Sequence, residues 1–284
     1  MMPNYIFSVD VEDWFHILDV PSAPALAEWS GLPSRVERNF SRLLDIFSEH
    51  QVQVTCFVLG WVGERFPQLV KDAVARGHEI ASHGYAHRLV YEQTRGEFYE
   101  DVHRARLLLE DIAGVPVVGY RAPGFSTTSE TPWFFEALAE AGYQYDSSIF
   151  PAHRAHGGIP DARRDPYRVN GDGILELPIT VANFMGRGMC FFGGGYLRFF
   201  PYWLISSKVK EVAAGGRPVV FYIHPREIDP EHPRLPMSAS RAFKSYVNLE
   251  STEPKLRRIL REFPVTTFQK VISNYSLLVK SHVA

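Results

Sequence analysis

Two histidines spaced four residues apart, His83 and His87, are the first residues in this chain whose types and spacing suggest chemistry. They come just after Glu79-Ile80-Ala81, a run typical of the end of a strand. Residues i and i+4 share one face of a helical turn, and two neutral imidazoles on one face can bind a single divalent ion. Histidines at this spacing are more often structural, so a metal site depends on further ligands from elsewhere in the chain.

Charged side chains that could complete such a site stand at the ends of other predicted strands. The run Asp10-Val11-Glu12-Asp13 ends the strand predicted over residues 5–9, and Arg121, Asp146 and His224 belong to later strand ends. Two histidines and one carboxylate leave a position open for water, and an ion bound in this way lowers the pKa of that water towards about 7. A second acid could act as general base and His224 as general acid, while Arg121 would keep a neighbouring carboxylate ionised. This set of residues indicates hydrolysis.

The elements that must position these residues alternate between strand and helix about seven times. Polar residues stand at the carboxyl ends of the strands, which is typical of a parallel α/β barrel or a doubly wound sheet, where such ends meet at one mouth. Segments 151–172 and 229–250 are expected to be irregular, and no repeat or linker divides the chain. We predict strands over residues 5–9, 52–59, 78–82, 115–120, 143–148, 174–179, 219–223 and 265–268, and helices over 34–50, 67–76, 94–112, 131–141, 201–214 and 254–262.

Composition narrows the class of protein. The 284 residues are 45% hydrophobic and carry a formal net charge of -2, so we expect a sizeable α/β core and no nucleic acid partner. Neither a basic leader nor an apolar run of the roughly 20 residues that cross a membrane is visible, so a soluble cytoplasmic protein without a membrane span is expected. Cys56 lies in the apolar run 52–59 and is interpreted as a buried thiol.

Five stretches of the chain are specific in their combination and order: FSVDVEDW (7–14), SHGYAH (82–87), RAPG (121–124), GGGY (193–196) and FYIHP (221–225). In this order they resemble the NodB-homology polysaccharide deacetylases, carbohydrate esterase family 4. The resemblance is closest to the branch with PuuE-like allantoinases and Helicobacter-type peptidoglycan deacetylase, and closer still to deacetylases of exopolysaccharide and PEP-CTERM export loci. It spans about residues 5–274. It implies a distorted (β/α) barrel of seven or eight strands, as a single domain over residues 1–284 with a family-specific C-terminal extension over about residues 228–284.

The resemblance also implies roles by motif position. Asp10 matches the general base, and Arg121 matches the arginine that orients this base. His224 matches the general acid. His83 and His87 match ligands of a divalent metal, with zinc as the expected ion.

The remaining site residues come from the same motifs. Glu12 matches the carboxylate ligand in the branch that has an acid two residues after the base, and Asp13 is the competing ligand. The oxyanion would be held by the metal and by a backbone N–H near Gly124, in the motif that also contains Pro123. Asp146 matches the aspartate that tunes the acid histidine, which places it with Pro123 and Gly124 around the substrate.

The implied activity is a metal-dependent hydrolysis that removes an N-acetyl group from an amino sugar, with an N-acetylated glycan or glycan precursor as partner. Two alternatives stay open: an amide hydrolase acting on a small cyclic amide, a ureide or an N-formyl sugar, and a non-catalytic carbohydrate-binding barrel. A glycosidase using Asp10 and Glu12 would leave the histidines without a role, and acids so close in sequence cannot readily flank a glycosidic bond. The oligomeric state is not predicted.

Other conspicuous residues are expected to be structural. His78 opens a predicted strand, and His153 and His156 lie in a long loop, where exposure is expected. Gly193-Gly194-Gly195 lacks the Lys-Ser/Thr of a phosphate-binding loop, so it is interpreted as a point of close backbone approach. Glu176 is a candidate for lining the groove.

Overall fold

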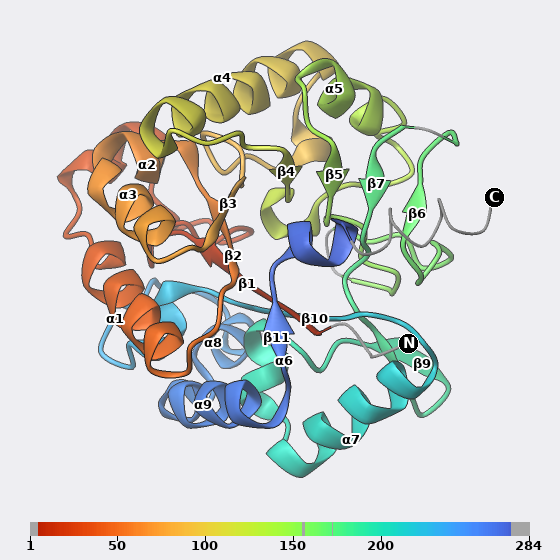
Figure 1. The fold of residues 1–284 in the computed structure, drawn as a ribbon. Coiled ribbons are helices and arrows are strands. Elements are labelled where there is room, and N and C mark those ends of the chain that lie inside the picture. The colour runs from red at the N-terminus through yellow and green to blue at the C-terminus, as the bar shows by residue number, and fades with distance from the viewer. Residues whose placement is uncertain (1–4, 155–156, 172, 274–284) are drawn as a thin grey trace.

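The strands of this chain form one mixed sheet that curls into a half-barrel, which confirms the predicted fold class (Figure 1). A computed structural model describes residues 5–154, 157–171 and 173–273, so His156, Asp172 and the end of the predicted extension lie outside the described residues. The strands are β1 (Tyr5–Val11), β2 (Thr55–Val58), β3 (Glu79–Ser82), β4 (Gly119–Tyr120), β5 (Tyr145–Asp146), β6 (Tyr167–Arg168), β7 (Leu175–Glu176), β8 (Ala182–Phe184), β9 (Arg187–Met189), β10 (Val219–Ile223) and β11 (Val265–Thr266). The sheet order is β10-β1-β2-β3-β4-β5-β7-β6, and β11 also pairs with β1. Neighbours are parallel except β6 with β7, and β8 and β9 form a separate hairpin.

Helices surround the strands as a ring in Figure 1. They are α1 (Val36–Glu49), α2 (Gly60–Arg65), α3 (Pro67–Ala75), α4 (Arg95–Ala113), α5 (Phe134–Glu140), α6 (Gly194–Phe199), α7 (Tyr202–Ala214), α8 (Ala239–Tyr246) and α9 (Thr252–Glu262). The boundaries of α4 follow local signals, because Thr94 and Glu97 form a capping box and Gly114 ends the helix in the left-handed region at φ 67°. Six of the nine helices in the described residues were expected from the sequence, while α2, α6 and α8 were not.

The central strand β1 shows how the sequence divides the inside of the barrel from the outside. Successive side chains of a strand point to opposite faces. Phe7 and Val9 belong to the apolar core between the sheet and the helices, and Ile6 belongs to the smaller core inside the barrel. Ser8 and Asp10 share the inner face with Ile6, which brings both polar groups into the barrel.

Two local expectations were wrong. Residues 83–87 do not form a helical turn: they follow β3 as a loop, and His87 itself has a φ of 53°. The segment 229–250, expected to be irregular, contains α8, whose N-cap Ser238 accepts a hydrogen bond from the Arg241 N–H. Apolar residues recur at Ala239, Ala242, Phe243 and Tyr246, which is the i, i+3, i+4, i+7 spacing of a helix, so this pattern could have revealed α8 from the sequence.

One end of the half-barrel is closed by the chain that follows β11. The Phe268 N–H donates to Thr55 Oγ1 and the Gln269 N–H donates to Glu79 Oε2, at the first residues of β2 and β3. Figure 1 shows this segment, in blue, in front of the strands. The closure leaves the opposite end of the strands, their carboxyl end, for chemistry.

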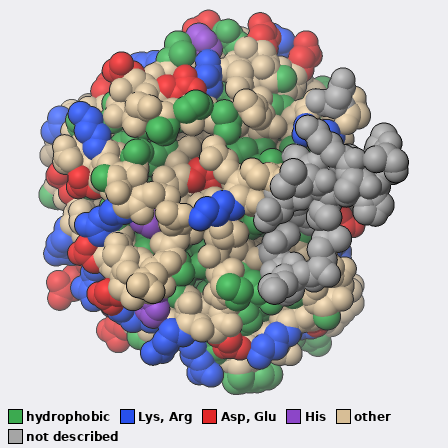
Figure 2. Space-filling view, viewed as in Figure 1, with side chains coloured by type: hydrophobic (Ala, Val, Ile, Leu, Met, Phe, Trp, Pro, Cys, Tyr) green, Lys and Arg blue, Asp and Glu red, His purple; other side chains and the backbone are tan. Residues whose placement is uncertain are grey.

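On the face drawn in Figure 2, basic and acidic side chains intermingle around the rim, as the small net charge leads one to expect. None of the helices in the described part of the chain combines the length and the apolar character that crossing a membrane requires.

Candidate active site

The candidate residues lie together at the carboxyl ends of parallel strands. Asp10 is in β1 and Glu12 directly follows that strand, while His83, Arg121 and His224 directly follow β3, β4 and β10. These strands belong to the consecutive parallel part of the sheet, so their ends meet at one edge. The side chain of His224 is 16% exposed, whereas the other four are nearly inaccessible, so His224 is the member with access to solvent.

Glu12, His83 and His87 form a cluster that could hold a metal ion. Each offers a ligand atom, and these atoms all lie within 4.8 Å of one another. Glu12 Oε2 is buried without a hydrogen-bond partner, 2.7 Å from His87 Nε2. His83 Nδ1 faces the Arg121 carbonyl at 2.8 Å, which places the imidazole proton on Nδ1 and leaves the Nε2 lone pair available. Two imidazoles and one carboxylate are ligands that suit zinc, so the residues present fit a divalent ion.

The charge states of this cluster also suit a cation. Burial lowers the pKa of His83 to about 4, so the imidazole is neutral near pH 7, as a metal ligand must be. Burial alone would raise the pKa of Glu12, but the charges of His87 and His224 outweigh it and hold that pKa well below its usual value. The loop with the two histidines is positioned by Asp101 of α4, which accepts hydrogen bonds from the Tyr85 and Ala86 N–H groups at 2.7 and 3.1 Å.

Asp13, the competing ligand from the sequence, has a different environment. Its carboxylate accepts hydrogen bonds from Ser34 Oγ and from the backbone N–H groups of Trp14, Arg35 and Val36. The last two are unpaired donors at the N-terminus of α1, so Asp13 caps this helix from a distant part of the chain. The structure therefore brings Glu12, and not Asp13, to the two histidines.

Asp10 is fixed by a buried arginine. Arg121 Nη1 donates to Asp10 Oδ1 at 2.7 Å and to Ser8 Oγ at 2.7 Å, and its Nε donates to the Ser147 carbonyl at 3.2 Å. The guanidinium also lies 4.1 Å from the centre of the Phe57 ring. An ion pair of this kind restricts the orientation of the Asp10 carboxylate. The second oxygen, Oδ2, lies 3.8 Å from His224 Nε2.

His224 is held between two carboxylates. Its Nε2 lies 3.0 Å from Glu12 Oε1, and its Nδ1 lies 2.5 Å from Glu227 Oε1. Burial opposes a charge on His224, but the negative charges of Glu12 and Glu227 outweigh it and raise the pKa of the imidazole above its ordinary value. An imidazole in this setting keeps a proton near neutral pH, which suits a general acid.

Glu227 corrects the expectation for Asp146, which was matched to the aspartate that tunes the acid histidine. Asp146 instead bonds Ser148 Oγ at 2.6 Å and lies beside Glu176, inside the barrel. Burial raises the pKa of both Asp146 and Glu176, so this pair shares a proton rather than lining an open groove. The three-residue spacing from His224 to Glu227 in the 3-10 turn Pro225–Ile228 is a capping-box pattern, and this signal could have revealed Glu227 from the sequence.

A second residue that the sequence did not reveal, Arg198 of α6, supports this pair. Its Nε donates to Glu227 Oε2 at 3.0 Å, and both groups are buried. Its other nitrogens donate to the carbonyls of Lys244, Ser245 and Val247 at 2.9 to 3.1 Å, at the end of α8. The C-terminal part of the chain is therefore tied to His224 through one arginine and one carboxylate.

The glycine-rich stretch before α6 allows this approach. A Cβ on Gly193 would lie 2.2 Å from the Tyr222 ring, and one on Gly195 would lie 2.6 Å from the Lys244 carbonyl. The stretch is therefore a point of close approach, as predicted. In the RAPG motif, Pro123 is buried, and Gly124 has a φ of 62° and accepts a hydrogen bond from Arg154 Nη1 through its carbonyl.

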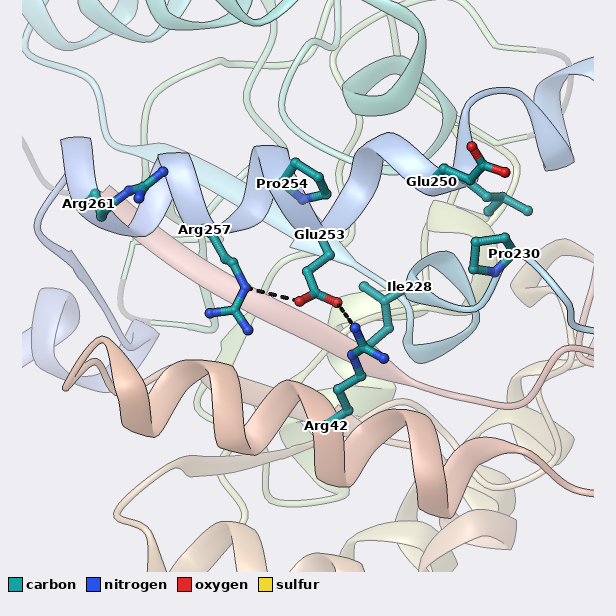
Figure 3. A pocket seen from close by; sticks show the side chains of 9 residues that line it. Arg42, Ile228, Pro230, Glu250, Glu253, Pro254, Arg257 and Arg261 are labelled. Carbon is teal, nitrogen blue, oxygen red and sulfur yellow. Dashed lines mark hydrogen bonds and ion pairs between the residues drawn. The ribbon is translucent and has the colours of Figure 1, made fainter.

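Two cavities lie near this part of the molecule. A cavity of about 450 Å³ is lined by His87, Leu89 and Trp29 together with residues of the loop from Phe15 to Pro24, so it opens beside the metal cluster. A cavity of about 560 Å³ lies between α1 and α9 (Figure 3). There Glu253 pairs with Arg42 and Arg257, and none of the candidate active-site residues lines it.

Comparison with known proteins agrees with this geometry. Residues 31–145 match the family model for polysaccharide deacetylase, and residues 147–273 match a domain of unknown function, DUF3473. The chain is 30% identical over 113 residues to the peptidoglycan deacetylase of Helicobacter pylori, an alignment that covers 40% of this chain and 38% of that protein. The chain thus matches well under half of the length of this relative.

Solved structures show the same fold. A Mycobacterium smegmatis protein classed by name with the polysaccharide deacetylases has a TM-score of 0.64 at 22% identity, covering 98% of this chain and 91% of that chain. PuuE allantoinase has a TM-score of 0.59 at 17% identity, covering 93% and 86%. Over less than half of its length, the chain is therefore similar to polysaccharide and peptidoglycan deacetylases.

Proposed function

We propose that this chain is a metal-dependent deacetylase that hydrolyses the N-acetyl amide of an amino sugar in a polysaccharide or its precursor. One observation carries the proposal: an arginine-held carboxylate, a carboxylate-held histidine and a three-residue metal cluster meet at one edge of the sheet. Amide hydrolysis needs these three elements, because a proton must leave water, a proton must reach the amine and the carbonyl must be polarised.

The roles follow from the contacts. Glu12, His83 and His87 would hold a divalent ion, which we propose to be zinc. When bound, this ion supplies Lewis acidity, which polarises the amide carbonyl and lowers the pKa of water. Asp10, held by Arg121, accepts the proton of the attacking water at its carboxylate. His224, which keeps a proton beside Glu227, donates it from Nε2 to the leaving amine.

The substrate would approach from the solvent side of His224. Pro123 and Gly124 follow Arg121 by two and three residues. Gly124, which unlike proline has a backbone N–H, therefore stands near the sheet edge of the base, where this donor would hold the oxyanion. We assign the enzyme to the exopolysaccharide-associated branch of its family on the five motifs of the sequence. We also propose that the chain is one domain, in which the part from residue 228 onward supports His224 through Arg198.

The test is release of acetate and free amine from a panel of N-acetylated glycans, with and without a chelator. The wild-type protein should release both products from at least one glycan, and the chelator should abolish release. His83→Ala should lose bound metal and at least roughly 100-fold in kcat/KM, since even partners outside the ligand shell are worth 10–100-fold. The matched control is His153→Ala, which removes an exposed histidine in a loop.

Three results would contradict the proposal. Full metal content and activity in His83→Ala would exclude the metal cluster. Hydrolysis of a cyclic ureide or an N-formyl sugar, without release of acetate from any glycan, would favour the small-substrate alternative. Binding of glycans without any hydrolysis by the metal-loaded protein would favour a non-catalytic barrel.

A further inference from the structure

Arg226 is a cation without a partner beside the candidate active site. It lies two residues after His224, in the 3-10 turn Pro225–Ile228. Its Nη1 is buried without a hydrogen-bond partner, and within the described ranges its guanidinium makes neither a hydrogen bond nor an ion pair. Arg226 is only partly buried, so its other donors can meet water, but leaving the buried Nη1 donor unpaired is unfavourable. Such a group indicates a partner that is not part of the described chain.

Two further donors near Arg226 are also unpaired. Arg241 of α8 donates from Nη2 to the Leu18 carbonyl at 2.7 Å, but its Nε is buried without a partner. His16 accepts the Asp13 N–H at Nδ1, so its proton is on Nε2, and this nitrogen is buried without a partner as well. The charge of Arg226 contributes to lowering the pKa values of both groups, which shows that they lie within its electrostatic reach.

One acceptor accompanies these donors. His232 Nδ1 faces the Pro233 carbonyl at 2.8 Å, so the proton is on Nδ1, and Nε2 is a buried acceptor without a partner. The charge of Arg226 also contributes to the low pKa of His232. Outside the metal cluster, where Glu12 Oε2 is also unpaired, three unpaired donor groups stand against one unpaired acceptor, so donors outnumber acceptors.

The carboxylates around Arg226 are engaged elsewhere. Asp10 pairs with Arg121, and Glu227 pairs with Arg198. Glu12 faces His87 and His224. A divalent ion at the metal cluster would add still more positive charge to the region.

The acids farther along the chain do not change this balance. Asp229, three residues beyond Arg226, pairs with Arg35 and Arg38. The charge of Asp19 acts on Arg241. Arg226 therefore stands next to Glu12 and His224 without a carboxylate of its own.

We propose that Arg226, with Arg241 and His16 as neighbouring donors, binds an anionic group that the substrate carries close to its N-acetyl sugar. This inference rests on the proposed deacetylase function and names its substrate class: acidic N-acetylated glycans or phosphorylated sugar precursors. A carboxylate and a phosphate each present a pair of oxygens that a planar guanidinium can bind with two parallel hydrogen bonds. The adjacent His224 then faces the amide nitrogen of the same sugar or of its neighbour.

The test compares kcat/KM on neutral and anionic substrates. Chitotetraose is the neutral substrate, a hyaluronan tetrasaccharide supplies carboxylates, and N-acetylglucosamine 1-phosphate supplies a phosphate. In Arg226→Gln the ratio of anionic to neutral kcat/KM should fall about 10- to 100-fold, the range for hydrogen bonds to charged groups. Arg226→Lys, which keeps the positive charge but cannot make two parallel hydrogen bonds, should recover only part of the ratio. Arg65→Gln, an exposed arginine of α2, is the matched control and should leave the ratio unchanged.

The outcomes distinguish a carboxylate from a phosphate as the ligand, and they distinguish failure of the anion site from failure of the deacetylase function. Dependence on Arg226 for only one anionic substrate identifies carboxylate or phosphate as the ligand. An unchanged ratio in Arg226→Gln overturns the inference while leaving deacetylation intact.

Binding provides a readout that does not need turnover. N-Acetylglucosamine 1-phosphate should raise the Tm of the metal-loaded protein more than N-acetylglucosamine does, and Arg226→Gln should remove the difference. Anion binding to the metal alone would persist in this variant, so equal shifts in both proteins overturn the inference. A shift that depends on Arg226, found in a protein that releases no acetate, supports the anion site and rejects the deacetylase.

Discussion

Replacing Asp13 and Glu12 separately distinguishes an acid that caps a helix from the neighbouring acid that we propose as a metal ligand. Asp13→Ala removes the carboxylate that accepts hydrogen bonds from Ser34 Oγ and from the Arg35 and Val36 N–H groups. Glu12→Gln keeps the shape of its side chain but removes the negative charge. We expect the first change to reduce the stability of the fold and the second to reduce metal binding.

The size of the effect at Asp13 can be worked out from its contacts. Loss of an N-terminal cap costs about 0.5–2 kcal/mol, and leaving a buried donor unpaired costs about 1–3 kcal/mol. Burial raises the pKa of Asp13, so the cost of burying the carboxylate already offsets part of the stabilisation that its hydrogen bonds provide. A net loss of roughly 2–4 kcal/mol follows, which corresponds to a fall in Tm of roughly 5–10 °C for a chain of this length.

The assay measures Tm and bound metal for both variants, after loading with zinc and removal of excess ion. Asp13→Ala should keep its metal and melt at the lower temperature, while Glu12→Gln should lose metal affinity by more than roughly 100-fold. Loss of metal from Asp13→Ala at unchanged Tm, with metal retained by Glu12→Gln, would refute the reasoning and make Asp13 the ligand.

Two further predictions concern buried titratable groups. Burial lowers the pKa of His78 to about 4, so between pH 6.5 and pH 4 the unfolded chain binds a proton that the folded chain does not, and stability falls as the pH falls. In His78→Asn, whose oxygen can still accept the Val54 N–H, the change of the unfolding free energy with pH should be smaller by up to about 1.4 kcal/mol per pH unit. Urea unfolding that shows the same pH dependence in both proteins over that range would contradict this prediction. Glu227→Gln should lower kcat about 10- to 100-fold with metal content unchanged, from the ~1.5–3 kcal/mol of a hydrogen bond to a charged group. As the pH rises, kcat/KM of this variant should begin to decline at a lower pH than in wild type, because Glu227 helps to raise the pKa of His224. Superimposable pH profiles would exclude this role. Glu253→Gln on α9 is the control.

Much of this architecture could be predicted from the sequence, because local signals decide it. The capping box at Thr94 and the glycine at position 114 set the ends of α4, and apolar runs mark most strands. Polar residues directly after those runs had to meet at one sheet edge, since parallel strands bring their carboxyl ends together. Asp10, His83, Arg121 and His224 could therefore be named before their distances were known.

Local rules were less informative where contacts far apart in sequence decide the outcome. The loop of His83 and His87 was expected to be a helical turn. Two of its backbone N–H groups instead donate hydrogen bonds to Asp101 of α4, which fixes the loop in an irregular conformation. The short β4 and β5 are another case: their sequences allow longer strands, but only two residues of each pair in the sheet.

The sequence by itself determined the alternation of strands and helices and the kinds of residue at the strand ends. Only the tertiary structure placed Glu12, and not Asp13, beside the two histidines, because that placement depends on where the N-terminus of α1 packs. It also decided that Glu227 and Arg198, and not Asp146, support His224. A hydrogen bond needs an approach of about 3 Å, and in a folded chain such approaches are set by packing between segments that no local pattern relates.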